Sequence, residues 1–410
     1  MVATTMTTKM KMGCALALML PVLASAQYNI VKSYEGSSFF DDWNFYNNFD
    51  NLTNGDAIFV SAQQAAQDKL AFVNSAGHAI MKVDNTSQVA FNQKRNTVRI
   101  ASKDRFSVGS VWVADMLHVP FGCSVWPAWW SQAPGWPAGG EIDTFEAVNL
   151  APRPQMALHT EPGCTVTNPQ QSSTLVNATD CSFQANSNEG CVTTNPATNS
   201  YGQPFADAGG GVWATEFAEK GISIWFFSVR AAEVPRTAGH FHRANVPDSL
   251  KNNASSLDTS TLGTPVANYP PTSCNIDKFF SAQNLIFDIT LCGDHRFPIC
   301  MTYFPLRMRN PLSTHSPVPQ PVHGLFPIDF AGNPATFTQT CSGVCYNDFV
   351  IGPPSNYDNA YFEVASVRVY GTSASVDVKP NGNGASSRFT SSFALAGAVA
   401  VAGAGLMAVL

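Results

Sequence analysis

Short stretches in which apolar and polar residues alternate recur along the chain, separated by turns rich in Gly, Pro, Asn and Ser. Side chains of a β-strand alternate between its two faces, so this pattern predicts strands. Clear examples are residues 79–83, 97–101, 108–113, 221–230, 284–292 and 361–370. Between the two ends of the chain, no long segment has a convincing helical period, and no internal repeat is found. The pattern predicts an all-β sandwich.

Two long segments interrupt this pattern. Residues 118–140 are rich in Pro and Trp, and we expect a stiff loop that leads into the next strand. Residues 160–210 are polar, rich in Asn, Thr and Gly, and contain three cysteines. Loops of this length are usually functional or are tied down by disulfides. We expect this segment to form the wall of a cleft.

Three acids occur in the six-residue sequence Glu-Ile-Asp-Thr-Phe-Glu, in a chain where charged residues are only 13%. On a strand, Glu141 and Asp143 would share one face, whereas Glu146 would lie on the other. A β-bulge at residues 144–145 would bring all three to one face. Carboxylates this close raise one another's pKa, so one is expected to hold a proton at neutral pH. A protonated carboxylic acid beside an ionised one can hydrolyse a glycosidic bond. A solvated acidic edge strand is the structural alternative.

The context of these acids resembles glycoside hydrolase family 16, specifically the fungal laminarinase-like endo-1,3(4)-β-glucanases. The signature Glu-Ile-Asp-x-x-Glu follows Trp126-Pro127-Ala128-Trp129-Trp130 and Trp136-Pro137-Ala138-Gly139-Gly140. The similarity extends from about Tyr34 to Tyr370 and includes residues 38–41, 96–100, 118–123, 158–160, 224–227, 291–294 and 360–364. The resemblance implies a β-jelly-roll sandwich of the concanavalin A-like type, with a substrate cleft across its concave face.

The resemblance also implies a role for each acid. Glu141 would be the nucleophile that forms a covalent glycosyl-enzyme, and Glu146 the general acid that then acts as base. Asp143 would hydrogen-bond Glu141 and tune its charge. The reaction would be endo-acting, retaining hydrolysis of β-1,3- or mixed β-1,3/1,4-glucan. His159, on the adjacent strand, would face the site and support the acids, with a buried core histidine as the alternative.

Several side chains are candidates for binding the sugar. Aromatic rings bury the CH face of a pyranose, which makes three tryptophans candidates. They are Trp126, Trp130 and Trp136, although alternation allows only one of Trp129 and Trp130 to face the cleft. Asn149 and Arg99 could donate hydrogen bonds to hydroxyl groups, with a structural ion pair as the alternative for Arg99. No cofactor is expected, and the sequence contains no recognisable metal-ligand cluster.

Two other functions remain open. Fungal cell-wall transglycosylases of the same family have Glu-x-Asp-x-Glu, without the extra residue found here, so the spacing favours hydrolysis. Sugar and water nevertheless compete for the same intermediate. A lectin-like sandwich would bind glucan without cleaving it, but a binding module has no need of crowded acids. The net charge of -6 argues against nucleic acid as a partner and favours a neutral polymer, β-glucan.

The ends of the chain predict secretion and anchoring. Residues 1–26 have the basic start, apolar run and small-residue cleavage site of a signal peptide. A catalytic domain at 27–372 would be followed by a polar linker at 373–392 and an apolar tail at 393–410. Spacer and tail together are typical of a GPI-attachment signal, with a tail-end transmembrane helix or a poorly cleaved secreted form as the alternatives. We therefore expect a monomer at the cell surface or cell wall, in contact with the membrane only through this anchor.

Removal of the signal peptide would leave nine of the ten cysteines, which should pair in an oxidising compartment. Cys300 is expected to remain unpaired, and Cys181 with Cys191 would close a sensible local loop. The remaining connectivity is open. Four sequons agree with secretion, at Asn51, Asn85, Asn177 and Asn253.

One segment departs from the family pattern. There, Cys-Gly-Asp is usually followed at once by Trp-Ala-Gly. Here Cys292-Gly293-Asp294 is followed by residues 295–329, which carry Cys300, and only then by Phe330-Ala331-Gly332. We hypothesise that 295–329 is an insertion and that an unspliced intron in the gene could be its origin. Phe330 stands where the family has a sugar-binding Trp.

Overall fold

The computed structural model describes residues 27–174, 178–229, 245–251, 254–293, 332, 334–371 and 375–377. The predicted signal peptide, the segment 295–329 with Cys300, the apolar tail and the sequons at Asn177 and Asn253 lie outside these residues. Among the helices of the described part, none is long and apolar enough to cross a membrane. The described part reaches Asp377, beyond the expected end of the catalytic domain at residue 372, because β21 (Val376–Asp377) pairs with β9 (Arg105–Phe106).

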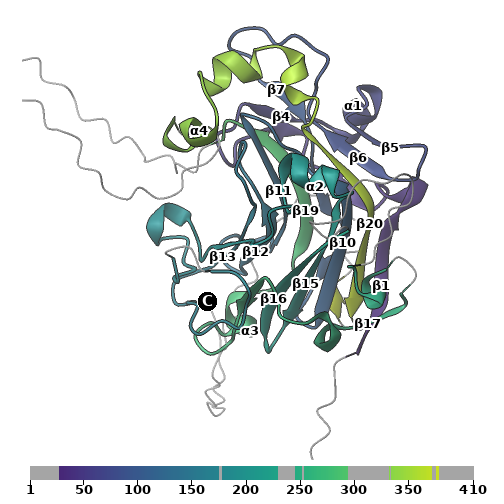
Figure 1. Cartoon of the computed structure of the whole chain (residues 1–410), viewed down its shortest axis with the longest axis vertical. Coiled ribbons are helices and arrows are strands. Elements are labelled where there is room, and N and C mark those ends of the chain that lie inside the picture. The colour runs from purple at the N-terminus through teal and green to yellow at the C-terminus, as the bar shows by residue number, and fades with distance from the viewer. Residues whose placement is uncertain are drawn as a thin grey trace, which may run out of the picture. The chain divides into compact units, whose positions relative to one another are not determined.

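Two antiparallel sheets that pack against each other build the domain, so the all-β prediction is confirmed (Figure 1). Within the described residues, the larger sheet has nine strands and the other has seven. The larger sheet runs in the order β17 (Ser256–Asp258), β1 (Gln27–Glu35), β20 (Tyr361–Gly371), β10 (Ser110–His118), β15 (Gly211–Ala218), β16 (Gly221–Ser228) and β18 (Ala267–Tyr269). In addition, β6 (Ala79–Lys82) pairs with β20, and β5 (Ala71–Val73) pairs with β6. The smaller sheet runs in the order β14 (Thr193–Thr194), β13 (Gln155–His159), β12 (Glu141–Glu146), β11 (Val125–Gln132), β19 (Asn284–Leu291), β8 (Arg99–Ser102) and β2 (Trp43–Phe45).

The remaining elements are short, in agreement with the lack of helical periodicity. A small sheet joins β3 (Asn48–Phe49), β4 (Ala57–Phe59) and β7 (Arg95–Thr97). The α-helices are α1 (Ala62–Gln67), α2 (Gly202–Asp207), α3 (Ile276–Phe279) and α4 (Pro334–Thr340). Single turns of 3-10 or π geometry are η1 (Gly36–Ser38), η2 (Asn186–Asn188), η3 (Asp248–Leu250), η4 (Thr259–Leu262), η5 (Cys345–Val350) and η6 (Pro354–Tyr357).

The expectation of a long loop over residues 118–140 is wrong in its middle, where β11 forms a central strand. Pro127 made a strand there look unfavourable, because proline cannot donate to a sheet ladder. The structure places Pro127 just past the end of β12, where its carbonyl accepts from the N–H of Ala147. On that side β12 has already ended, so the missing N–H interrupts no ladder. The other neighbour, β19, pairs with β11 along its whole length.

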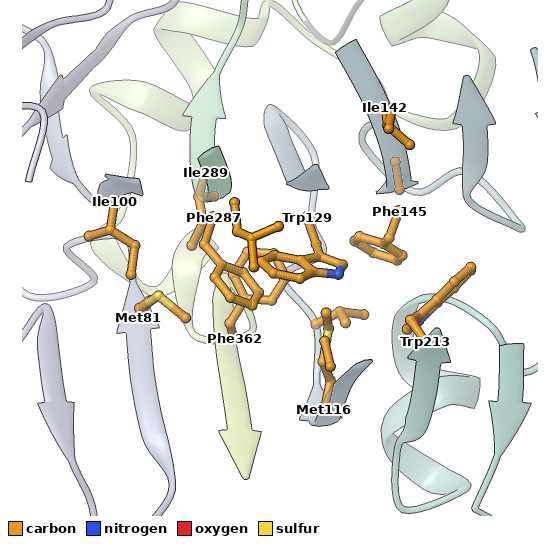
Figure 2. Packing of buried hydrophobic residues seen from close by; sticks show 14 of the residues in the cluster. Met81, Ile100, Met116, Trp129, Ile142, Phe145, Trp213, Phe287, Ile289 and Phe362 are labelled. Carbon is orange, nitrogen blue, oxygen red and sulfur yellow. The ribbon is translucent and has the colours of Figure 1, made fainter. Parts of the chain in front are cut away.

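The predicted bulge is present in β12. Opposite β12, Trp129 pairs with Phe145 and Trp130 pairs with Asp143, so Thr144 is the extra residue. Ile142 and Phe145 are both fully buried in the core between the sheets, where Figure 2 shows them near Trp129 and Trp213. Regular alternation would place positions 142 and 145 on opposite faces. The bulge therefore leaves the three acids together on the other face.

Among the described residues, four disulfides use the eight cysteines that were expected to pair, and the local Cys181–Cys191 pair is confirmed. The others are Cys123–Cys341, Cys164–Cys274 and Cys292–Cys345. Two of these bridges, Cys164–Cys274 and Cys181–Cys191, tie down the polar segment 160–210. Cys123–Cys341 joins residue 341 to the connection between β10 and β11. Cys292–Cys345 joins residue 345 to the end of β19.

The chain leaves and rejoins the fold at one point around the unusual segment. The N–H of Gly332 donates to the carbonyl of Gly293 at 3.0 Å. Without residues 295–329, three residues would separate these two glycines, namely Asp294, Phe330 and Ala331. The bond would then be an i to i+4 bond, which closes a single α-turn. This geometry supports the hypothesis that 295–329 is an insertion into an otherwise continuous turn.

We expect that a chain lacking residues 295–329 folds with an unchanged or higher melting temperature, because the fold already closes across the gap and a shorter loop loses less entropy. Thermal unfolding of the two purified chains measures this. A deletion of equal length inside 160–210, which removes described contacts, is the control and should prevent folding. Failure of the 295–329 deletion to fold, or a transcript population that retains the segment throughout, would contradict the insertion hypothesis.

Candidate active site

A pocket lies on the face of the smaller sheet that points away from the core. Its floor comes from β8, β11, β12 and β19, and residues 51–54 form one side. Asn188 adds a contribution from the segment 160–210, which agrees with the expected cleft wall. Seven of the nine predicted site residues line this pocket, and six of them are Arg99, Trp126, Trp130, Trp136, Glu141 and Glu146. The seventh is Asp143, between the two glutamates in the sequence.

Glu146 is held by a neighbouring indole. The N–H of Trp126 donates to Glu146 Oε1 at 2.7 Å, and only 4% of Trp126 is exposed. Trp126 was expected mainly to stack on a sugar ring. Its position gives it a further function, because a donor at this distance stabilises the ionised form of the carboxyl group.

Glu141, Asp143 and His159 form a second group of contacts. His159 lies on β13 directly opposite Glu141, and its Nε2 is 3.3 Å from Asp143 Oδ2. Asp143 is also hydrogen-bonded to Glu141. One ligand-type atom from each of the three lies within 4.8 Å of the other two, so among the described residues this group has spacing that could hold a cation. Such crowding equally suits acids that share protons.

Burial raises the pKa of all three acids. The pKa of Asp143 rises to about 8, chiefly because burial penalises its charge. The pKa of Glu146 also rises to about 8, through burial and the nearby Asp143, against the lowering effect of the Trp126 N–H. For Glu141 the pKa lies well above its ordinary value, through burial and then Asp143. The group therefore retains protons at neutral pH, as an acid catalyst requires.

Arg99, Trp130 and Asp288 form the opposite side of the floor. The Trp130 indole donates to Asp288 Oδ1 at 2.6 Å, and the Arg99 guanidinium lies 4.8 Å from the centre of the Trp130 ring. Arg99 Nη1 is 3.8 Å from Asp288 Oδ2. Of the two tryptophans left open, Trp130 faces the pocket and Trp129 is fully buried. Arg99 thus both lines the pocket and has the ion-pair partner that was its alternative role.

The structure does not bring Asn149 to the pocket, which corrects its expected role in sugar binding. Asn149 has a positive φ of 54° and is 1% exposed. Its Oδ1 accepts from the N–H of Ser124, and its carbonyl accepts from the Tyr201 hydroxyl. Asparagine tolerates this backbone conformation, so Asn149 supports the turn that follows the catalytic strand. His159 likewise stands behind the acids and does not line the pocket.

Several pocket residues were missed by sequence reasoning. Asp288 and Thr290 alternate along β19, a strand that was predicted, so their shared face was a usable signal. Residues 51–54 gave no such signal. Their position depends on Asp50, which is buried and accepts from the N–H groups of Leu52 and Thr53 and from the hydroxyls of Thr53 and Thr290. Asp50 thereby joins this loop to β19.

A two-sheet sandwich with three crowded carboxyl groups that share protons, beside pocket tryptophans, is the arrangement of a glycoside hydrolase. The profile of the XgeA-like catalytic domain of glycoside hydrolase family 16 matches residues 43–301. The chain belongs to this family, as the sequence resemblance predicted.

Named relatives and solved structures agree with this assignment. A probable glycosidase of Schizosaccharomyces pombe is 32% identical over 353 residues, which cover 85% of this chain and 71% of the relative. The endo-1,3(4)-β-glucanase xgeA of Emericella nidulans is 30% identical over 369 residues, or 89% of this chain and 51% of the relative. Laminarinase 16A from Phanerochaete chrysosporium, solved with 6-O-glucosyl-laminaritriose, is 30% identical with a TM-score of 0.68, over 84% of this chain and 100% of that chain.

A second solved structure, an elongating β-1,3-glucosyltransferase of family 16, is also 30% identical, with a TM-score of 0.64 over 84% of this chain and 99% of that chain. The chain spans about half the length of several of the endo-1,3(4)-β-glucanases that it matches. These laminarinase and transferase structures share the fold of the described domain.

The raised pKa of Glu146 predicts a pH-dependent penalty on folding. Unfolding lets the carboxyl group ionise near pH 4.5, whereas in the fold it ionises near pH 8. The penalty is absent below pH 4 and grows as the pH rises toward 8. We expect Glu146→Gln to raise the melting temperature at pH 8 and to leave it nearly unchanged at pH 4. Thermal unfolding of both chains at the two pH values measures this, and an equal shift at both would contradict the argument.

Proposed function

We propose that this chain is an endo-acting, retaining β-glucanase that hydrolyses β-1,3- or mixed β-1,3/1,4-glucan. The observation that carries the proposal is the bulged strand β12, which presents Glu141, Asp143 and Glu146 together at the floor of a pocket lined by tryptophans. On one strand, Glu146 with its raised pKa supplies the acid, and the Glu141 carboxylate supplies the nucleophile that retaining hydrolysis needs.

Each acid has a step in this reaction. Glu146 protonates the leaving oxygen, because its raised pKa keeps the proton available near neutral pH. Glu141, in its ionised form, attacks the anomeric carbon and forms a covalent bond to the sugar, while the bond to the leaving group breaks. Glu146, now ionised and stabilised by the Trp126 N–H, accepts a proton from water, which cleaves the intermediate. Asp143 holds Glu141 in place through the hydrogen bond between their carboxyl groups.

The proposed substrate class follows from the relatives and agrees with the pocket. Several curated relatives are named endo-1,3(4)-β-glucanases or probable ones, and the Phanerochaete laminarinase binds a β-glucan in donor and acceptor sites. In this chain, Trp130 and Trp136 offer rings to pyranose faces, and Arg99 offers donors to hydroxyl groups. A neutral glucan also suits this site, because acids that retain and share protons attract no strongly charged ligand.

Transfer to a second sugar is the alternative reaction that an observation favours. The elongating β-1,3-glucosyltransferase is as similar in sequence as the Phanerochaete laminarinase. Both reactions use the same intermediate and differ in whether water or sugar attacks it. The bulged spacing Glu-x-Asp-x-x-Glu favours hydrolysis. A lectin function is disfavoured, because raised pKa values bring a binding site no benefit.

We also propose that the protein is secreted and held at the cell surface, as a monomer. Four disulfides in the described part support an oxidising compartment. The polar spacer and apolar tail motivate a GPI anchor as the means of attachment. Release of the protein from cells by a phosphatidylinositol-specific phospholipase would support the anchor, and retention after this treatment would contradict it.

We expect Glu141→Gln to lower the release of reducing sugar from laminarin by roughly 10³-fold or more, because the nucleophile is lost. Product length distinguishes hydrolysis from transfer, since transfer yields chains longer than the oligosaccharide supplied. Glu219→Gln, an exposed glutamate at the turn between β15 and β16, is the matched control and should retain full activity. Wild-type protein that binds laminarin and mixed-linkage glucan without cleaving either would favour the lectin function.

The Trp126–Glu146 bond predicts a shift in the pH profile. Replacing Trp126 by Phe keeps an aromatic ring and removes the N–H that favours ionised Glu146. The pKa of Glu146 should rise further, by about one unit for the loss of a hydrogen bond to a charged group. We expect the alkaline limb of kcat/KM on a laminari-oligosaccharide to move to higher pH. Trp225→Phe, in the larger sheet, is the control, and an unmoved limb in Trp126→Phe would contradict the assigned contact.

A further inference from the structure

A left-handed turn stands beside the catalytic acids. Asn186, Ser187 and Asn188 have φ angles of 49°, 59° and 67°, so three consecutive residues other than glycine adopt the left-handed conformation. This conformation costs about 1–2 kcal/mol for an ordinary residue, and less for asparagine. Strained backbone of this kind persists only where its surroundings fix it, and it is concentrated at functional sites.

The surroundings of the turn fix it closely. The Cys181–Cys191 disulfide closes the short loop that contains it. Gly190 has a φ of 74° and lies against β13, the strand next to β12. A Cβ added at Gly190 would come within 2.6 Å of the Leu158 carbonyl oxygen and 2.9 Å of the His159 ring. The loop therefore packs directly on His159.

Asn188 is the residue that the turn delivers to the site. It is 3% exposed, lines the pocket, and places its Oδ1 3.2 Å from Nδ1 of His159. The other ring nitrogen, Nε2, faces Asp143 Oδ2 at 3.3 Å. Asp143 Oδ2 is buried and has no hydrogen-bond partner among the described residues. A continuous line of contacts therefore runs from Asn188 through His159 to Asp143 and Glu141.

The chemistry of these atoms restricts where protons lie. An amide oxygen only accepts hydrogen bonds, so the contact with Asn188 requires a proton on Nδ1 of His159. In the neutral ring Nε2 then has a free lone pair, which can accept a proton from Asp143. Within the described part of the chain, the titratable groups that face the ring are carboxyl groups: Glu141, Asp143, Glu146 and Glu189. Without a fixed Nδ1 proton, Nε2 would carry the hydrogen and could no longer accept.

We propose that Asn188 is a positioning residue for the reaction, which fixes the Nδ1–H form of His159 so that Nε2 shares one proton with Asp143. The left-handed turn and the Cys181–Cys191 disulfide hold the amide oxygen of Asn188 beside Nδ1 of His159. This shared proton fixes the orientation of Asp143, which lies against Glu141, the carboxylate that attacks the sugar. The proposal rests on the proposed function for its kinetic consequence, but the form of His159 can be observed without activity.

Asn188→Gly is the central variant, because glycine adopts a positive φ freely and only the amide is lost. Asn186→Gly is the matched control, since it makes the same change two residues away in the same turn. Asn188→Asp restores an acceptor oxygen and is the conservative variant. We expect kcat/KM on laminari-oligosaccharides to fall roughly ten- to a hundredfold in Asn188→Gly, the range for losing a partner behind a functional histidine. Asn186→Gly should stay near the wild type, and Asn188→Asp should recover most of the loss.

A substrate with an activated aryl leaving group shows whether Asn188→Gly slows the reaction through the nucleophile Glu141 or through the acid Glu146. Such a substrate needs no proton from Glu146 when its glycosidic bond breaks, so the rate of this step does not depend on the acid. Because the Asn188 line ends at the nucleophile, Asn188→Gly should slow cleavage of this substrate as much as that of the oligosaccharide. A loss confined to the oligosaccharide would overturn the proposal.

The imidazole ¹⁵N spectrum of the full chain gives a readout that does not depend on catalysis, with His159→Gln to assign the signal. We expect a protonated Nδ1 in the wild type and in Asn186→Gly, and a shift toward the Nε2–H form in Asn188→Gly. A wild-type ring with a bare Nδ1 would overturn the proposal. If the wild type shows the expected spectrum but cleaves no glucan, the proposed function fails and the assignment of Asn188 stands.

Discussion

The burial of three carboxylic acids at one point is the constraint on which the site depends. Ionisation of all three would place like charges together in a poorly solvated pocket, so protons are retained and shared. The structure tolerates this because each acid has a specific neighbour: the Trp126 N–H for Glu146, Glu141 for Asp143, and the Arg99 guanidinium near enough to favour ionised Glu141. The burial that raises the pKa of these acids lowers the stability of the fold, and the same raised pKa lets Glu146 act as an acid near neutral pH.

Strand β11 connects this site to the core. Its alternate residues Trp126, Ala128 and Trp130 face the pocket, while Trp129 stacks on Phe287 with ring centres 4.2 Å apart inside the sandwich (Figure 2). The same strand pairs with β12 on one side and β19 on the other. Packing of the core side therefore fixes the positions of the groups on the pocket side, which suits a site that needs preorganised donors.

Irregular segments complete the pocket, and each is held by a definable interaction. Asp50 joins residues 51–54 to β19 through four hydrogen bonds. The Cys181–Cys191 disulfide confines the turn that carries Asn188. The contact between Gly293 and Gly332 closes the fold across the segment that departs from the family pattern. In each case a short-range contact decides where a loop lies, which is how a rigid sandwich supports variable binding loops.

Sequence by itself determined the fold class, the three acids and the need for a bulge, because alternation and spacing are properties of neighbouring residues. It suggested the local Cys181–Cys191 loop but left the disulfide connectivity open. It left Trp129 and Trp130 undecided, missed β11 because of Pro127, and placed Asn149 in the cleft. Only the tertiary structure decided these points: pairing with β19 and the end of β12 accommodate Pro127, and the core selects Trp129. Asp288, residues 51–54 and Asn188 also came from the structure alone, because each reaches the site from a distant part of the chain.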